Sequence, residues 1–213
     1  MTSEATAYLC RVDPTLRRLI ATIGPCTLKP RDRRSPFEAL VQAVVFQQLN
    51  GKVAETILGR VKALYPGRRF PSPEDLVGTP DAKLRAAGLS RAKTASVKDI
   101  AEKALTGVVP TRRQVARLSE PEILDRLTTL RGVGPWTVQM LLIFTLGRQD
   151  VLPATDYGVR KGFALTYGWK ELPRPKELLE YGEKWRPHRT TAAWYFWRAL
   201  ELPSTGPEKR SAF

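Results

Sequence analysis

The chain has 213 residues, of which 42% are hydrophobic, and a formal net charge of +14 at pH 7. This length suits one domain or two small lobes with a sizeable core, and the charge surplus indicates a polyanionic partner, of which nucleic acid is the commonest. No apolar run reaches membrane-spanning length and the first residues lack a secretion signal, so we expect an intracellular protein without membrane attachment, located in the cytoplasm or nucleoid if bacterial.

Helical patterns dominate the chain, and no stretch predicts a strand, so the expected fold class is all-α. A capping residue, often followed by proline, opens many of these patterns. The expected helices are 13–23, 37–48, 52–65, 73–77, 80–87, 91–105, 110–118, 122–130, 135–146, 156–167, 176–185 and 190–200. The tail from residue 203 to residue 213 is expected to be disordered.

A glycine hairpin separates two of the expected helices, with the sequence LRGVGPWT at residues 130–137. Gly132 and Gly134 can adopt positive φ angles and let a ligand approach the backbone closely. The amides of these glycines, Trp136 and Thr137 can converge on one phosphate oxygen at the start of a helix. The hairpin therefore predicts a phosphate grip, and a tight helix–helix turn is the alternative.

A single acidic residue, Asp156, follows Trp136 by twenty positions and opens the next helix. The simplest interpretation is a helix cap. Because a fixed carboxylate at a helix start can also stabilise positive charge that develops on a substrate, a catalytic role is the second interpretation. Neither a serine nucleophile motif, a phosphate-binding P-loop nor a metal-ligand pattern is present, so an enzyme of this sequence would depend on carboxylates or a lysine.

These features together resemble the helix-hairpin-helix DNA glycosylases, and among them the AlkA-type 3-methyladenine glycosylases. The resemblance covers roughly residues 35–202 and includes FEALVQAVVFQQLN at 37–50, GLSRAK at 88–93, the hairpin, LPATD at 152–156 and WRPHR at 185–189. It implies two helical lobes with a DNA-binding cleft between them. One lobe would span 36–149, with the helix-hairpin-helix at about 122–147, and the other would join 1–35 to 150–202.

The resemblance also implies residue roles. Asp156 aligns with the catalytic aspartate, and the hairpin residues Arg131, Gly132, Gly134, Trp136 and Thr137 align with the phosphate-binding segment, where relatives often hold Na⁺ or K⁺ through main-chain carbonyls. Gln48, with Leu49 as the alternative, falls in the loop that fills the gap left by a flipped nucleotide. The base pocket would comprise Trp136, Tyr157, Met140 and His188.

Some residues depart from the family pattern. Trp136 stands where the bifunctional relatives carry a lysine nucleophile, so strand cleavage is not expected. The four carboxyl-terminal cysteines of the iron–sulfur relatives are missing. Asn50 replaces a usual serine, and His188 and Met140 replace aromatic residues. Lys93 can be interpreted either as a solvated charge or as a phosphate contact, and Asp150 as a structural residue before Leu152.

The resemblance implies a monofunctional glycosylase that needs no cofactor and acts on double-stranded DNA containing alkylated bases of the 3-methyladenine and 7-methylguanine type. Such an enzyme flips the damaged nucleotide out of the helix and leaves an abasic site. No self-complementary oligomer feature stands out in the sequence, so we expect a monomer. Two other functions stay open at this point. The protein could act on deaminated or mismatched bases, or it could be a non-catalytic helix-hairpin-helix module that binds DNA without using Asp156.

Overall fold

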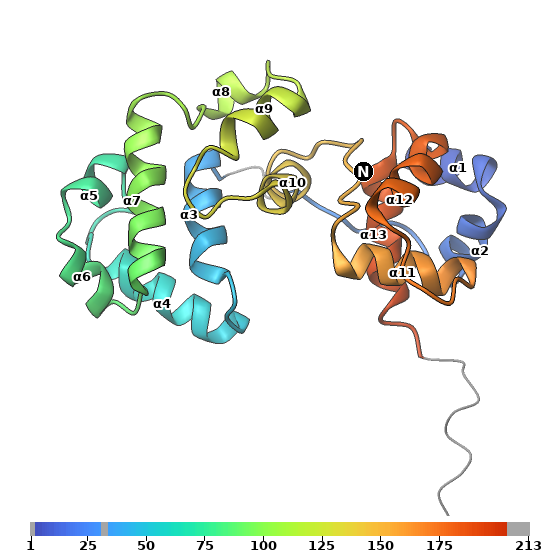
Figure 1. The fold of residues 1–213 in the computed structure, drawn as a ribbon, viewed down its shortest axis with the longest axis horizontal. Helices are drawn as coiled ribbons and strands as arrows, with labels where there is room; N and C mark the ends of the chain where they lie inside the picture. Colours follow the sequence, from blue (N-terminus) through green and yellow to red (C-terminus); the bar gives the residue numbers. More distant parts are fainter. Residues whose placement is uncertain (1–2, 31–33, 204–213) are drawn as a thin grey trace, which may run out of the picture. The chain divides into compact units, whose positions relative to one another are not determined.

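The structure, a computed structural model, describes residues 3–30 and 34–203, and every regular element within these ranges is a helix (Figure 1). The prediction of an all-α fold is confirmed. None of the helices in these ranges is long and apolar enough to cross a membrane.

The chain divides into two compact units. Unit 1 combines residues 1–29 with 148–213, and unit 2 comprises residues 30–147. The boundaries expected from the sequence, 35/36 and 149/150, lie within a few residues of these divisions. Of the tail expected beyond residue 202, residues 204–213 lie outside the described ranges.

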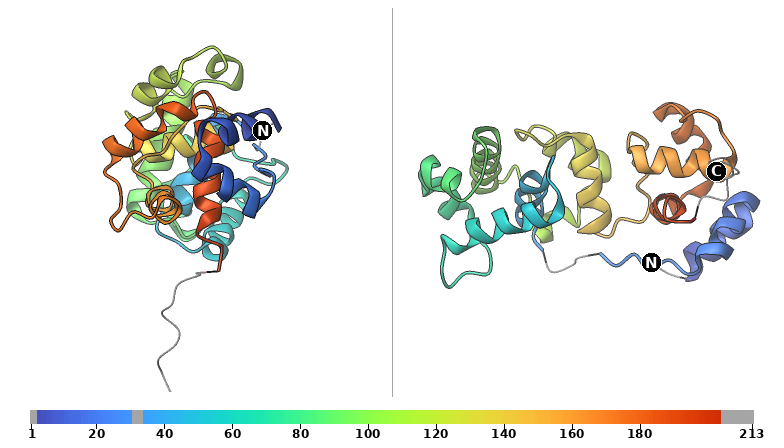
Figure 2. Two further views of the ribbon diagram at one scale, coloured as in Figure 1. Left: turned by 90° about the vertical axis from the view of Figure 1, so that its right-hand side faces the viewer. Right: turned by 90° about the horizontal axis from the view of Figure 1, so that it is seen from below.

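Unit 2 contains eight helices in its described part, and α7 packs against both α3 and α5 (Figures 1 and 2). The helices are α3 (Pro36–Phe46), α4 (Gly51–Ala63), α5 (Pro73–Gly78), α6 (Asp81–Ala86), α7 (Arg91–Leu105), α8 (Arg112–Val115), α9 (Glu120–Leu127) and α10 (Pro135–Phe144). Helix α3 buries Leu40, Val41, Val44 and Val45, because α7 and α10 pack against it. Leu130 and Val133 of the hairpin that joins α9 to α10 are buried as well.

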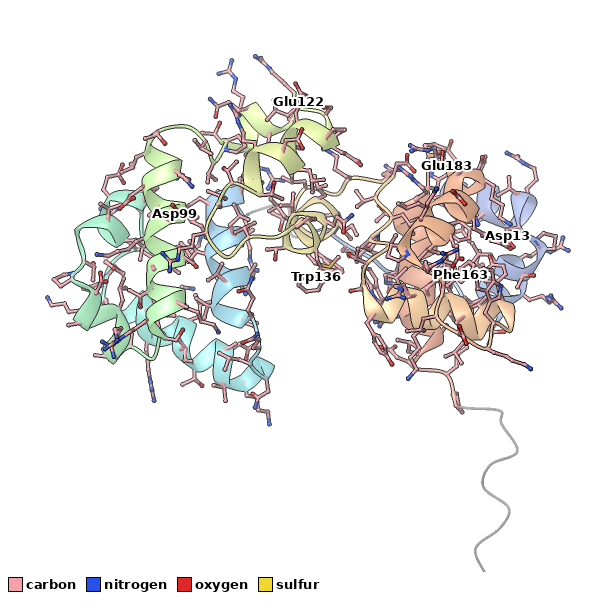
Figure 3. The ribbon with its side chains drawn as sticks, in the orientation of Figure 1. Asp13, Asp99, Glu122, Trp136, Phe163 and Glu183 are labelled. Carbon is pink, nitrogen blue, oxygen red and sulfur yellow. The ribbon has the colours of Figure 1, made fainter. Side chains whose placement is uncertain are left out.

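Unit 1 is built from both ends of the chain. Its helices are α1 (Ser3–Val12), α2 (Pro14–Ile23), α11 (Tyr157–Tyr167), α12 (Pro175–Tyr181), the 3₁₀ helix η1 (Gly182–Trp185) and α13 (Arg189–Ala199). Phe163 is fully buried at its centre among aromatic rings (Figure 3), and α11 lies across α13 (Figure 1). At this crossing a Cβ on Gly162 would overlap the carbonyl of Phe196, so the close helix approach requires glycine.

Most observed helices end within two or three residues of their predicted bounds, and three differ more. Helix α1 was not expected, since it buries only Ala5 and Leu9 among its apolar residues and shows too sparse a pattern. The expected helix 110–118 shortens to the four residues of α8, whose capping box starts it at Thr111. The expected helix 176–185 is two elements, because the backbone tightens to a 3₁₀ turn at Gly182.

Candidate active site and nucleic-acid interface

The glycine hairpin has a backbone that requires its two glycines for different reasons. Gly132 has a φ of +75°, and a Cβ there would lie 2.7 Å from the Ser96 hydroxyl oxygen. Gly134 caps α10 with a φ of −97°, and a Cβ there would meet no atom within 4 Å. No side chain forms a capping hydrogen bond at the start of α10.

Three side chains from other helices hold the hairpin in place. The carboxylate of Asp99, on α7 (Figure 3), accepts a 2.8 Å hydrogen bond from the backbone amide of Arg131. The ammonium of Lys103 donates to the carbonyl of Thr129, and the side-chain amide of Gln47 donates to the carbonyl of Gly132. The backbone is therefore held both before the turn and at its centre. The Arg131 side chain is exposed and that of Thr137 is buried.

The loop after α3 carries the predicted gap-filling residues. Gln48 is exposed and has a φ of +56°, the only positive φ at a non-glycine residue within the described ranges. Such a backbone angle is uncommon outside glycine and is often found at functional sites. Leu49 is also exposed, and Asn50 caps α4 by accepting a hydrogen bond from the amide of Val53, which explains why asparagine can replace serine there.

Two of the predicted base-pocket residues line one cavity in unit 2. The cavity has a volume of about 460 Å³, and Trp136 and Met140 line it together with Ala43, Phe46, Gln47, Gln48 and Thr137. Trp136 lies at the start of α10 (Figure 3), and 46% of its surface is exposed. Phe46 was not recognised from the sequence, because its position in an apolar helix is equally typical of a core residue. A separate hollow of about 600 Å³ beside α4 and α6 contains none of the predicted residues.

Asp156 caps α11 in unit 1, and one of its carboxylate oxygens has two donors. Its Oδ1 atom accepts hydrogen bonds from the backbone amide of Val159 at 2.8 Å and from the indole nitrogen of Trp197 at 2.9 Å. The carboxylate is half-buried. The capping interpretation is therefore correct. The second donor, the Trp197 indole, also orients the carboxylate, which capping alone does not require.

Trp197 lies on α13, and the sequence analysis did not identify it. Its indole reaches Asp156 because Gly158 lies between them, and a Cβ at Gly158 would be 2.9 Å from the Trp197 ring. The contact also depends on the close crossing of α11 and α13 at Gly162. Since the partners are separated by 41 residues in the sequence, only the tertiary fold brings them together.

The other two predicted base-pocket residues lie in unit 1 and differ in exposure. Tyr157 is 63% exposed at the first position of α11, and the ammonium of Lys161 lies 5.8 Å from its ring centroid. His188 is 9% exposed, its ring meets the Tyr8 ring edge-on at 5.2 Å, and its buried Nδ1 makes no hydrogen bond to any described residue. Tyr157 is thus available to a ligand from solvent, whereas His188 is packed.

Two further residues can now be assigned. Asp150 is structural, as expected, because its carboxylate accepts hydrogen bonds from Arg186 and from the nearly buried guanidinium of Arg189. Lys93 is not a solvated charge: its ammonium is half-buried and donates to the carbonyls of Val45 and Gln47 at the end of α3. A sequence pattern cannot show this contact, because the carbonyls belong to backbone 46 or more residues away. The other interpretation, a phosphate contact, stays a prediction.

The fold and these two sites define an all-helical protein in which a glycine hairpin opens one helix and a fixed aspartate opens another, a combination suited to acting on nucleic acid. The sequence model of the HhH-GPD superfamily of base excision DNA repair proteins matches residues 41–188. The chain therefore belongs to this superfamily.

Curated relatives and solved structures agree with this assignment. DNA-3-methyladenine glycosylase 1 of Schizosaccharomyces pombe is 37% identical over 203 residues, covering 94% of this chain and 88% of the relative. The structure of the 3-methyladenine DNA glycosylase of that yeast in complex with abasic DNA matches with a TM-score of 0.84, over 94% of this chain and 98% of that chain. A DNA-3-methyladenine glycosidase from Bacillus halodurans matches with a TM-score of 0.83 and 33% identity, over 93% and 89% of the two chains.

Proposed function

We propose that this protein is a monofunctional DNA glycosylase that hydrolyses the N-glycosidic bond of alkylated bases in double-stranded DNA and leaves an abasic site. The observation that carries this proposal is the geometry of Asp156, whose carboxylate is oriented by a backbone amide and by the Trp197 indole. A purely structural cap would be satisfied by the amide alone. The names of the similar glycosylases support the choice of alkylated bases.

The reaction needs one carboxylate and no strong acid. Alkylation at N3 of adenine or N7 of guanine leaves a cationic base, which departs with the electron pair of the N-glycosidic bond and becomes neutral. Positive charge develops on the sugar, and the anionic carboxylate of Asp156 stabilises it. Water then forms the new bond at the sugar carbon and gives its proton to the carboxylate or to solvent.

The cavity in unit 2 suits a flat, cationic ring. Phe46, Trp136 and Met140 supply apolar and aromatic surface, and Gln47 and Gln48 supply polar groups at its border. A cationic base stacked on a tryptophan gains about 1–2 kcal/mol when it is desolvated. Tyr157 offers a second exposed aromatic ring for a base or sugar contact. This lining favours alkylated bases over neutral deaminated bases, which need a pocket that forms several hydrogen bonds.

The hairpin would hold a DNA phosphate without reading the sequence, because contacts to phosphate oxygens are the same for every base. Gln48 would fill the space that the flipped nucleotide leaves, with Leu49 as its neighbour. Trp136 occupies the place of the lysine nucleophile in the bifunctional relatives, and an indole cannot form a Schiff base with the sugar. We therefore expect no strand cleavage.

We further propose that the chemistry needs no cofactor. The carbonyls of Thr129 and Gly132 already accept hydrogen bonds from Lys103 and Gln47, so Na⁺ or K⁺ at the hairpin would have to share these carbonyls or use their neighbours. A cation there would support the backbone and take no part in bond cleavage. Excision should continue in buffers that contain a chelator and in which tetramethylammonium replaces Na⁺ and K⁺.

We also propose that the protein acts as a monomer inside the cell, where its DNA substrate is found. The two sites described above are each complete within one copy of the chain. Sedimentation of the free protein and of a complex with one lesion-containing duplex should give masses for one copy of the protein in each case. A dimeric complex on a single lesion would contradict this proposal.

The test compares release of free methylated bases from methylated duplex DNA by the wild type and by Asp156→Asn. Asparagine remains a good helix cap, so the fold should persist while the charge is lost. We expect the variant to bind DNA as tightly as the wild type and to release bases at least about 100-fold more slowly.

Glu180→Gln is the matched control, because it removes the same charge from an exposed position of α12 in unit 1. It should leave both binding and release unchanged. If Asp156→Asn released bases as fast as this control, the protein would not use Asp156, and a wild type that binds DNA without releasing any base would indicate a binding module.

A further inference from the structure

The end of α3 is held by a lysine from another helix. The ammonium of Lys93, on α7, donates hydrogen bonds of 2.8 Å to the carbonyl of Val45 and 2.7 Å to the carbonyl of Gln47. Because α3 ends at Phe46, these carbonyls belong to the last turn, where helical backbone lacks partners of its own. A cation at this end also interacts favourably with the helix dipole. Two of the three ammonium donors are therefore committed to backbone carbonyls.

The residue directly after these carbonyls has the unusual backbone angle. Gln48 adopts a φ of +56°, a conformation that is unfavourable for a residue with a side chain and persists only where its surroundings fix it. Lys93 fixes the backbone on one side of Gln48. On the other side, the Asn50 cap fixes the start of α4.

The same loop is tied to the hairpin. The side-chain amide of Gln47 donates a 2.9 Å hydrogen bond to the carbonyl of Gly132, which has the positive φ angle at the centre of the turn. The hairpin and the loop that bears Gln48 thus share a direct contact, although they are 85 residues apart in the sequence.

One face of α7 supports both segments. Lys93, Ser96, Asp99 and Lys103 follow one another at intervals of three or four residues and so share one side of the helix. Lys93 contacts the loop after α3, Ser96 lies beneath Gly132, and Asp99 and Lys103 bind the backbone before the turn. All four contacts lie within unit 2.

We propose that Lys93 and Gln47 are positioning residues that hold Gln48 in the conformation needed to enter DNA and couple it to the phosphate-binding hairpin. The inference rests on the proposed function, since it gives Gln48 the role of filling the gap beside a flipped nucleotide. Lys93 and Gln47 would act through Gln48 and would not touch the reacting atoms. Gripping the phosphate and filling the gap would then occur in one fixed geometry.

The test uses Lys93→Met, which keeps the length of the side chain and removes the ammonium. Lys98→Met is the matched control, because Lys98 lies on the same helix and pairs with Asp81, away from the loop. Single-turnover excision is measured on a duplex with one 7-methylguanine paired to cytosine, and on the same strand with the lesion left unpaired opposite an abasic site. We expect Lys93→Met to be about 30-fold slower than wild type on the paired lesion and within about threefold on the unpaired one, because an unpaired base needs no displacement.

A double-mutant cycle tests whether Lys93 acts through Gln48. If it does, Lys93→Met adds little to the defect of Gln48→Ala, whereas independent roles would give multiplying defects. Gln47→Ala should behave in the same way as Lys93→Met. Equal rates for Lys93→Met and Lys98→Met, a defect that persists on the unpaired lesion, or multiplying defects would each overturn the proposal.

A second readout separates this inference from the proposed function. Fluorescence of 2-aminopurine paired to thymine reports whether the protein unstacks a paired base, and it requires no excision. If the wild type unstacks the base but never releases a methylated one, the proposed function fails while the positioning role is still tested. Unstacking by Lys93→Met that matches the wild type would contradict the positioning role in either case.

Discussion

At the start of α11, a single carboxylate oxygen of Asp156 accepts hydrogen bonds from a backbone amide and from the indole of Trp197. Two donors on one oxygen fix the plane of the carboxylate as well as its position. This arrangement directs the charge of the carboxylate toward one place before substrate arrives, which is the preorganisation that electrostatic catalysis requires.

Removal of the indole donor should therefore slow the chemical step. Trp197→Phe keeps most of the ring volume and loses the N–H group. We expect kcat for base release to fall about 10- to 100-fold with little change in DNA affinity, since a small misplacement of a reacting group has this effect. Trp194→Phe, one turn earlier on α13, is the control. Equal kcat values for the two variants would show that Trp197 has only a packing role.

Asp13 illustrates a buried carboxylate with a structural role (Figure 3). Burial alone would raise the pKa of its carboxyl group, but hydrogen bonds from Tyr167, the Leu16 amide, Trp185 and Lys184 outweigh burial and hold the pKa below its ordinary value. Burial raises the pKa of the Tyr167 hydroxyl, and the hydrogen bond that this hydroxyl donates to Asp13 raises it further.

This lowered pKa predicts how stability depends on pH. A carboxyl group whose pKa is lower in the folded protein than in the unfolded chain stabilises the fold fully above the unfolded pKa of about 3.9, and this contribution is lost as the pH falls through the folded pKa. Asp13→Asn should reduce the free energy of unfolding at pH 7 by about 2–3 kcal/mol. The difference from wild type should shrink below about pH 4, and a difference that stays constant down to pH 2 would refute this account.

The sequence was sufficient for residues whose role depends on local pattern. Asp156 was identified from its place at a helix start, and Gly132 and Gly134 from their spacing. The sequence was insufficient for Trp197 and Lys93. Their hydrogen-bond partners lie 41 or more residues away in the chain, and such contacts leave no periodic signal in the sequence. A tryptophan in an apolar helix and a lysine in a polar one both match ordinary packing and solvation, so only the fold reveals their partners.

At the scale of elements, the two hairpin glycines should respond differently to the same substitution. In Gly132→Ala the new methyl group would clash with the Ser96 hydroxyl, and alanine would have to adopt the positive φ of this residue. We therefore expect a loss of about 1–3 kcal/mol of stability together with weaker DNA binding. In Gly134→Ala the methyl group points into open space, so the Tm should stay within a few degrees of wild type while DNA affinity falls, because the methyl group obstructs the phosphate.

Thermal unfolding and DNA binding, measured on both variants, separate these effects. Gly78→Ala serves as the control, because a Cβ at that glycine meets no atom within 4 Å and the residue lies outside the hairpin. Wild-type DNA affinity in Gly134→Ala would be evidence against a phosphate at the start of α10.

Elements with strong end signals were predictable, and α1, in which only Ala5 and Leu9 are buried, was not. Helix α7 matches its predicted bounds, 91–105, because Ser90 caps it and an apolar face runs along it. Helix α1 was not predicted, because it is stabilised by packing on α2 and α13 and not by a strong local pattern. The tight crossing of α11 and α13 likewise depends on one glycine, Gly162. Its role is visible only in the folded protein, where it lies against the backbone of Phe196.

At the scale of the whole molecule, the net charge of +14 predicts salt-sensitive binding to DNA. If about four phosphates are contacted, affinity for an undamaged duplex should fall on the order of 100-fold between 50 and 200 mM salt, because bound counterions are released from the DNA. Fluorescence anisotropy with a labelled duplex measures this slope. An affinity that does not change over this range would argue that the charge is only a solvated surface.

The central claim is that this member of the HhH-GPD superfamily removes alkylated bases by hydrolysis, and one product analysis tests it most directly. The wild-type protein is incubated with a duplex containing a single 7-methylguanine, and both the small-molecule and the strand products are separated by chromatography. We predict free 7-methylguanine and an unbroken strand that breaks only after treatment with alkali, as an abasic site does. Absence of the free base, or a strand already cut at the lesion before alkali, would contradict the claim.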